Sequence, residues 1–167
     1  MSDRTKNETK LTTPSDTEVR VEREFEAPRE LVWECFADPD LLSEWLGPRY
    51  LKMKVEKYDF EPGGEWKYIH SDEEGNAYVF YGEFIELREP EYMKQTFNYE
   101  MEPQPPANID EAVLTALEGD RTLLVTTTTF DSKENRDGMI QAGMERGISE
   151  GNEQLDELLA RKMVGAK

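Results

Sequence analysis

Apolar and polar positions alternate along most of the chain, which predicts β-strands. Between Thr17 and Glu26, for example, Val19, Val21 and Phe25 alternate with charged residues. A period of two places the apolar side chains on one face and the charged ones on the other, as in a strand with one face toward water. Further apolar stretches, separated by turn signals, predict more strands. They cover residues 51–55, 66–70, 78–87, 92–101, 111–117 and 121–130.

Two short helices are predicted directly after the first strand. Pro28 suits the first turn of a helix whose apolar positions recur at helical spacing. Asp38 and Pro39 repeat this start signal, with Asp as the N-cap and Pro at the first helical position. Gly47 and Pro48 end the second helix.

The last long segment, residues 132–163, has helical periodicity. Its apolar residues fall within an arc of about 120° on a helical wheel, and Ser132 is a suitable N-cap. About thirty residues at 1.5 Å each predict a single helix of roughly 45 Å. The apolar arc contains Ile140, Met144, Gly147, Ile148, Gly151, Leu155, Leu158 and Leu159.

Gly147 and Gly151 are unusual within this apolar arc. Each costs about 1 kcal/mol relative to alanine in a helix interior, so some other interaction must offset them. One interpretation is the close approach of a neighbouring segment. The other is a hollow between the helix and the surface it covers. The residue pattern leaves both open.

The order of elements predicts an α+β domain. A meander of six to seven antiparallel strands must curl, and its apolar concave face needs a cover. The terminal helix is long and apolar enough to be that cover. Residues 1–16 are polar and without periodicity, which predicts a disordered tail, and residues 17–163 then form one domain.

The charge balance narrows the range of partners. Acidic residues outnumber basic ones 37 to 20, giving a net charge of −17. This disfavours binding to nucleic acid and to anionic membranes, which both need clustered Lys and Arg. Without a run of about 20 apolar residues or a secretory segment, we expect no membrane insertion and a cytoplasmic location. Exposed strand edges are compatible with either a monomer or a homodimer.

Few residues suggest catalysis, so no catalytic residue, cofactor or metal is expected. Cys35 lies in an apolar helical stretch and is interpreted as a core residue. His70, the one histidine, could be a polar anchor or proton-transfer group in a cavity, but its place near a hairpin favours a solvent-accessible side chain. A metal site formed by His70 with neighbouring acids would lack a second His or Cys ligand.

Several short motifs, in this order and spacing, resemble the START-like (SRPBCC) superfamily. The nearer branch is the one related to the C-terminal domain of the activator of heat-shock protein ninety ATPase. The matching segments span residues 18–162. They are residues 26–33 (EAPRELVW), Asp38-Pro39 followed by Leu42, Glu44-Trp45 and Gly47-Pro48, then residues 62–66 (PGGEW), 81–84 (YGEF), 143–147 (GMERG) and 155–159 (LDELL).

The resemblance implies a helix-grip (START/Bet v-like) fold with an apolar cavity between the curled sheet and the long helix. Relatives bind small hydrophobic molecules, so the first hypothesis is a non-enzymatic binding module. The alternatives are a chaperone ATPase regulator in the stress response, acting through its surface, and a pocket enzyme of cyclase or hydrolase type. The expected cavity-lining residues are Trp45, Trp66, Tyr68, His70, Tyr78, Phe80, Phe97, Met144, Gly147, Ile148 and Gly151.

Overall fold

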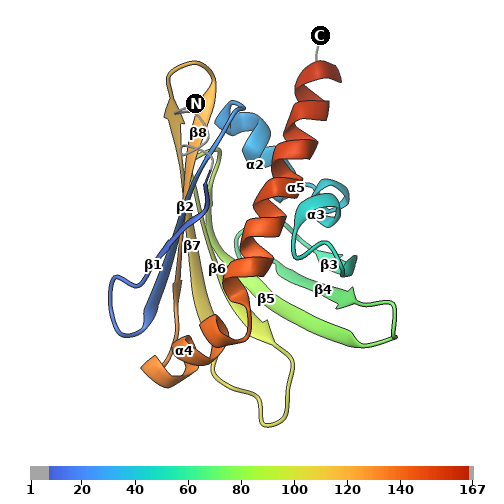
Figure 1. Cartoon of the computed structure of the whole chain (residues 1–167), viewed down its shortest axis with the longest axis vertical. Helices are drawn as coiled ribbons and strands as arrows, with labels where there is room; N and C mark the ends of the chain where they lie inside the picture. The colour runs from blue at the N-terminus through green and yellow to red at the C-terminus, as the bar shows by residue number, and fades with distance from the viewer. Residues whose placement is uncertain (1–7, 166–167) are drawn as a thin grey trace.

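The structure, a computed structural model, describes residues 8–165 and contains one antiparallel sheet of eight strands (Figure 1). Along the sheet the strand order is β1-β2-β8-β7-β6-β5-β4-β3. The α+β helix-grip expectation is thereby confirmed. The strands are β1 (Lys10–Thr12), β2 (Glu18–Phe25), β3 (Lys52–Tyr58), β4 (Glu65–Ser71), β5 (Ala77–Arg88), β6 (Tyr92–Tyr99), β7 (Asn108–Leu117) and β8 (Arg121–Thr129).

The extra strand, β1, corrects the expected tail over residues 1–16. Leu11 pairs with Val21 of β2, so this segment extends the sheet edge. Three residues are too few to show an alternation, which is why the pattern missed them. Residues 1–7 of the expected tail lie outside the described residues.

Within residues 8–165, four helices cover the concave face and one end of the sheet (Figure 1). Asp38 accepts a hydrogen bond from the Asp40 backbone N–H (2.9 Å), and Ser132 accepts one from that of Asn135 (3.1 Å), which confirms both predicted N-caps. The helices are α2 (Arg29–Ala37), α3 (Pro39–Trp45), α4 (Lys133–Gln141) and α5 (Met144–Gly165).

The prediction of one helix over residues 132–163 was wrong, because the segment breaks between α4 and α5. Gly143 adopts a φ of +100°, the left-handed region that side chains disfavour. Its N–H donates to the Ile140 carbonyl and ends α4. The break directs α4 away from the axis of α5, as Figure 1 shows.

The main core lies between α2, α3, the C-terminal half of α5 and the sheet. The Trp45 indole N–H donates to the Cys35 carbonyl (3.0 Å) and joins the two short helices. Cys35 is fully buried, as its interpretation as a core residue requires, and burial raises the pKa of its thiol to about 11. The largest buried side chains of this core include Phe25, Trp33, Trp45, Leu114 and Leu155.

The glycines of α5 pack against the segment that follows α3. A Cβ on Gly151 would lie 3.3 Å from the Trp45 carbonyl oxygen and 3.3 Å from the Gly47 nitrogen. A Cβ on Gly147 would lie 3.7 Å from Cδ of Pro48. The close-approach interpretation is therefore confirmed for Gly151, while Gly147 makes only an ordinary van der Waals contact with Pro48.

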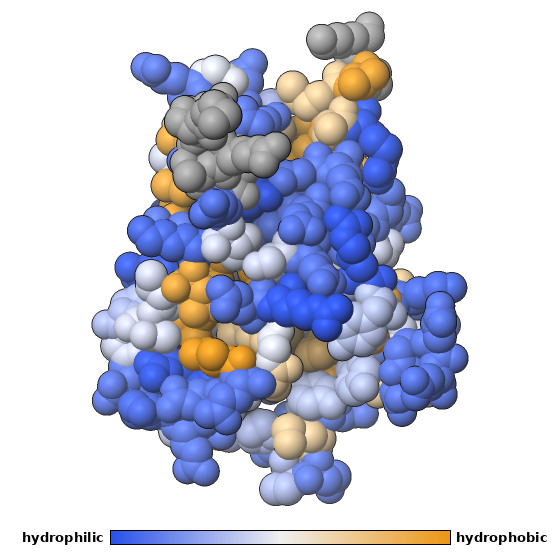
Figure 2. All heavy atoms as spheres, viewed as in Figure 1, coloured by the Kyte–Doolittle hydropathy of each residue, from blue (hydrophilic) through white to orange (hydrophobic). Residues whose placement is uncertain are grey.

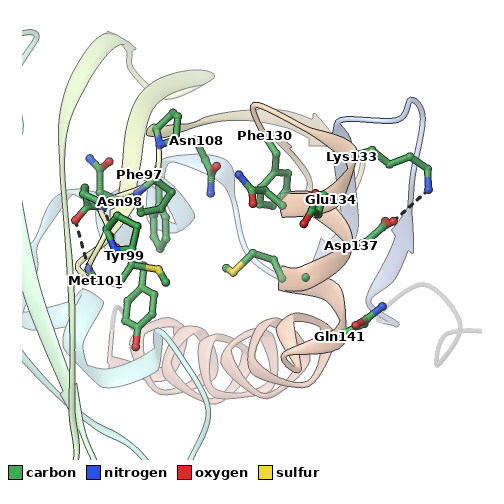
Figure 3. A pocket seen from close by; sticks show the side chains of 17 residues that line it. Phe97, Asn98, Tyr99, Met101, Asn108, Phe130, Lys133, Glu134, Asp137 and Gln141 are labelled. Atoms are coloured by element: carbon green, nitrogen blue, oxygen red, sulfur yellow. Dashed lines mark hydrogen bonds and ion pairs between the residues drawn. The ribbon is translucent and has the colours of Figure 1, made fainter.

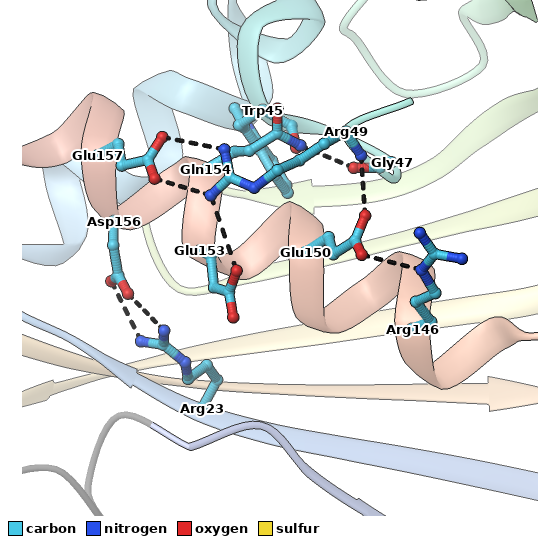
Figure 4. A network of polar contacts seen from close by, with 10 residues as sticks. All are labelled: Arg23, Trp45, Gly47, Arg49, Arg146, Glu150, Glu153, Gln154, Asp156 and Glu157. Atoms are coloured by element: carbon cyan, nitrogen blue, oxygen red, sulfur yellow. Dashed lines mark hydrogen bonds and ion pairs between the residues drawn. The ribbon is translucent and has the colours of Figure 1, made fainter. Parts of the chain in front are cut away.

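Polar contacts fix this seat of α5 (Figure 4). The Gln154 side-chain amide donates to the carbonyls of Gly47 (2.8 Å) and Trp45 (3.2 Å). The Arg49 backbone N–H donates to Glu150 (3.0 Å), and its guanidinium pairs with Glu157 (2.7 Å). These bonds satisfy backbone groups at the end of α3 and hold α5 close to this segment.

Enlarging Gly151 should therefore destabilise the fold. We expect Gly151→Val to lower the free energy of unfolding by about 1–3 kcal/mol, because the neighbouring atoms are backbone and cannot move aside cheaply. Gly138→Ala in α4 is the control, because a Cβ there meets nothing within 4 Å. That variant should gain up to about 1 kcal/mol from helix propensity. Urea denaturation measures both, and a neutral Gly151→Val would contradict the close packing.

Candidate ligand pocket

Strand β4 turns three ring-bearing side chains toward the inner face of the sheet. Trp66, Tyr68 and His70 are 2%, 6% and 5% exposed, so they share one buried face as their alternation predicted. His70 is not solvent-accessible, contrary to the interpretation favoured from sequence. Burial lowers its pKa to about 4, so its imidazole is neutral at pH 7.

His70 is held by the segment beneath α5. Gly47 has a φ of +93°, and a Cβ on it would lie 2.5 Å from Cε1 of His70. The imidazole therefore packs against the backbone of Gly47 on the sheet side, while Gly151 of α5 contacts the same residue. Among the described residues, Nδ1 of His70 has no hydrogen-bond partner.

An aromatic cluster continues from β4 across β5 and β6. Ring centroids lie 5.7 Å apart for Tyr68 and Phe80, 5.5 Å for Phe80 and Phe97, and 5.2 Å for the stacked pair Phe80 and Tyr99. Trp66 stacks on Tyr68 at 5.0 Å. These rings give the inner face of β4–β6 an apolar aromatic surface.

The other side of the inner face has a separate apolar cluster. Met144 and Ile148, from the first turns of α5, pack with Val19 and Val21 of β2 and with Phe130, which follows β8. The N-terminal part of α5 therefore packs over the β2–β8 side. The aromatic surface of β5 and β6 lies beyond it.

A pocket of about 900 Å³ lies between the two clusters, and we call it the α4 pocket. Figure 3 shows Phe97 and Tyr99 on one side of it, with α4 and Phe130 on the other. In Figure 2 hydrophobic residues are visible in a recess between α4 and the β4–β5 hairpin. The lining residues are Phe97, Asn98, Tyr99, Met101, Pro103, Gln104, Pro105, Pro106, Asn108, Phe130, Lys133, Glu134, Asn135, Asp137, Gly138, Met139 and Gln141.

A row of polar residues, Gln95, Asp110 and Thr128, crosses the inner face next to this pocket; we call it the polar row. The strand register places Gln95 opposite Asp110 and Asp110 opposite Thr128. The Thr128 hydroxyl donates to the Asp110 carboxylate (2.7 Å). Burial raises the pKa of Asp110 to about 6, and the Thr128 hydrogen bond partly opposes this shift.

The structure brings together some of the residues expected to line a cavity. Of that set, Phe97 lines the α4 pocket, and Phe80 contacts both Phe97 and Tyr99 in its wall. Trp66, Tyr68 and His70 lie further along the same aromatic face.

The other predicted residues lie away from the pocket. Tyr78 is half-buried opposite His70, and Trp45 packs in the main core. Met144 and Ile148 pack in the second cluster, and Gly147 and Gly151 face Pro48 and the backbone at Trp45–Gly47.

Several pocket residues were missed from sequence. Tyr99 shares the alternation of Phe97 and could have been found from it. Asn108, and Asp110 beside the pocket, precede the strand predicted over residues 111–117, whereas β7 begins at Asn108. Met139 comes to the pocket because α4 departs from the axis of α5, whereas Phe130 comes to it from the end of β8. No local pattern in the sequence marks that departure.

Two further observations concern other kinds of site. Within residues 8–165, no group of three or more His, Cys, Asp or Glu side chains is arranged to hold a metal ion. Among these same residues, no helix is both long and apolar enough to cross a membrane.

Comparison with solved structures finds the same fold in several bacterial proteins. Protein Ms6760 from Mycobacterium smegmatis is 26% identical, covering 91% of this chain and 96% of that chain, with a TM-score of 0.82. A protein from Arthrobacter aurescens is 25% identical over 91% of each chain, with a TM-score of 0.83. The AHSA1 protein from Silicibacter pomeroyi, 20% identical over 87% of this chain and 99% of that chain, shares the fold with a TM-score of 0.72.

The family comparison covers most of the domain. No curated protein matches this chain. The model of the family described as "Activator of Hsp90 ATPase homolog 1-like protein" matches residues 26–160, from the end of β2 through most of α5. The chain therefore belongs to this family, in the START-like superfamily that its motifs resemble.

Proposed function

We propose that this protein binds a small hydrophobic molecule in the α4 pocket, without chemical turnover. The observation that carries the proposal is the incomplete burial of the inner face beside this pocket. Phe80, Phe97 and Tyr99 are only half-buried although they lie on the concave side of the sheet. A close-packed interior would bury such rings, so their partial exposure supports a hollow that a ligand can fill.

The size and lining of the pocket fit this proposal. Small-molecule sites are typically concave, about 300–1,000 Å³, and mainly apolar with a few polar groups. The α4 pocket has this volume, with aromatic, proline and methionine side chains beside Asn108, Asn135 and Gln141. Met139 and Met101 can adapt their shape to a ligand, since methionine is unbranched and flexible.

The position of His70 favours binding over catalysis. The enzyme alternative depended on His70 or a tyrosine acting as acid or base in the cavity. His70 instead packs against Gly47, outside the residues that line the α4 pocket. Burial keeps the pKa of the Tyr68 phenol well above its ordinary value, which makes it a poor base at neutral pH.

A second candidate function follows from the family. The family description names an activator of a chaperone ATPase, so this chain could act on such an ATPase through its surface. Stimulation of a purified chaperone ATPase would support this candidate. If the surface acts, a variant with a filled pocket should stimulate equally, whereas a flat response of the unmodified protein would reject the candidate.

Filling the pocket should abolish ligand binding. Asn108 lines the pocket from β7, so Asn108→Trp should weaken binding of the neutral fluorescent probe N-phenyl-1-naphthylamine about tenfold or more, by steric exclusion. Thr115→Trp is the matched control, because Thr115 is an exposed residue at an odd position of the same strand, on the outer face. Fluorescence titration measures both. Equal affinity in the two variants, or no binding to the unmodified protein, would contradict the proposal.

Asp110 should reduce the stability of the fold at neutral pH. Because its pKa is raised to about 6, the folded state binds more protons than the unfolded state between about pH 4 and 6, and stability falls as pH rises through this range. We expect Asp110→Asn, whose amide oxygen can still accept from Thr128, to be more stable than the unmodified protein by about 1–3 kcal/mol at pH 7.5.

This gain should disappear near pH 4, where Asp110 is protonated in the folded state. Urea denaturation at pH 4 and pH 7.5 measures the change. Asp16→Asn, at an exposed position, is the control for a general effect of net charge. A gain that is the same at both pH values, or shared by the control, would show that the Asp110 carboxylate is not desolvated.

A further inference from the structure

We propose, as an extension of the proposed function and dependent on it, that the ligand carries a basic amine. The ammonium group of this ligand pairs with the carboxylate of Asp110 while its apolar part occupies the α4 pocket. Three features of the described residues support this assignment. They are the place of Asp110 beside the α4 pocket, its lack of a basic partner, and the aromatic surroundings together with the negative charge of the chain.

Asp110 lies at the boundary between the pocket and the packed core. On the inner face of β7, Asn108 lines the pocket and Ala112 is buried in the core. Asp110 stands between them, two residues or about 7 Å from each. The same boundary recurs on the flanking strands. Gln95 lies between Phe97 and Met93, and Thr128 precedes the pocket residue Phe130 by two positions.

Asp110 is enclosed by protein yet still accessible. Burial is the main cause of its raised pKa, but the side chain is half-buried and not fully enclosed. Asp110 lies on the concave face of the sheet, next in the strand alternation to the pocket residue Asn108, so its accessible part lies beside the pocket. The carboxylate can therefore be reached by a group that enters through the α4 pocket.

The Asp110 carboxylate has unused bonding capacity. Two carboxylate oxygens can accept about four hydrogen bonds, and within the described part of the chain Thr128 supplies one. The influences on its pKa are burial and this one bond, with no contribution from a basic side chain. An ionised carboxylate in such a place is costly unless a cation pairs with it, and an ammonium group on the ligand would provide that partner.

The surroundings favour a cation over an anion. The rings of Phe97 and Tyr99 offer faces that attract ammonium groups and stack on planar apolar groups. At the wall formed by α4, the Lys133 ammonium is already paired with Asp137 (3.2 Å) and is not free to bind an anionic ligand. The chain carries a net charge of −17, which raises the local concentration of cations and repels anionic ligands such as fatty acids.

Three probes of matched shape test the inference: 1-pyrenemethylamine, 1-pyrenemethanol and 1-pyrenecarboxylate, titrated by fluorescence in about 0.15 M salt, which screens surface charge. We expect the amine to bind about 10- to 100-fold more tightly than the alcohol, as for a charged hydrogen bond that is partly desolvated, and the carboxylate most weakly. Asp110→Asn should remove the preference for the amine and leave the affinity for the alcohol unchanged.

Glu118→Gln is the control, because it removes one carboxylate at an exposed site in the turn between β7 and β8, outside the pocket. It should keep the preference for the amine. Equal binding of amine and alcohol, or an amine preference that survives Asp110→Asn, would overturn the inference while the binding function stands. Failure of all three probes to bind would overturn the inference together with the binding function.

Discussion

The close contact between α5 and the segment after α3 determines where the interior of this protein is filled and where it is not. Gly151 lets the helix backbone approach the backbone of Trp45 and Gly47, and Gln154 joins the two by hydrogen bonds. A helix seated this closely on one side cannot also pack closely over the whole inner face. Its first turns cover β2 and β8, and the aromatic face of β5 and β6 stays half-exposed.

The break at Gly143 gives the remaining space a second wall. A helix continuing straight from α5 would carry Met139 along the same axis. The left-handed conformation of Gly143 instead turns α4 so that it lines the pocket opposite Phe97 and Tyr99. The glycines of this segment thus have two different roles, because Gly151 permits close packing and Gly143 permits a change of direction.

The polar row separates the pocket from the core and explains how this chain can keep the pocket open without collapse. If aliphatic side chains replaced the polar row, the apolar core would extend without a break across the inner face of the sheet. It would then reach from Met93 and Ala112 to Phe97 and Phe130. A partly desolvated carboxylate lowers stability, and groups that do so are frequent at functional sites. Both proposed functions, ligand binding and action on a chaperone ATPase, are compatible with this arrangement.

The sequence by itself determined the class of the fold, most strands, both short helices and two N-caps, because these depend on periodicity and on local capping chemistry. It also placed Trp66, Tyr68 and His70 on one face. The burial of His70, the break at Gly143 and the position of the pocket were decided by tertiary structure. His70 is buried against Gly47, which itself packs against Gly151 of α5, and these three residues are far apart in the sequence. Asp110 can be recognised as a candidate binding residue only from the strand pairing, which places Gln95 on one side of it and Thr128 on the other.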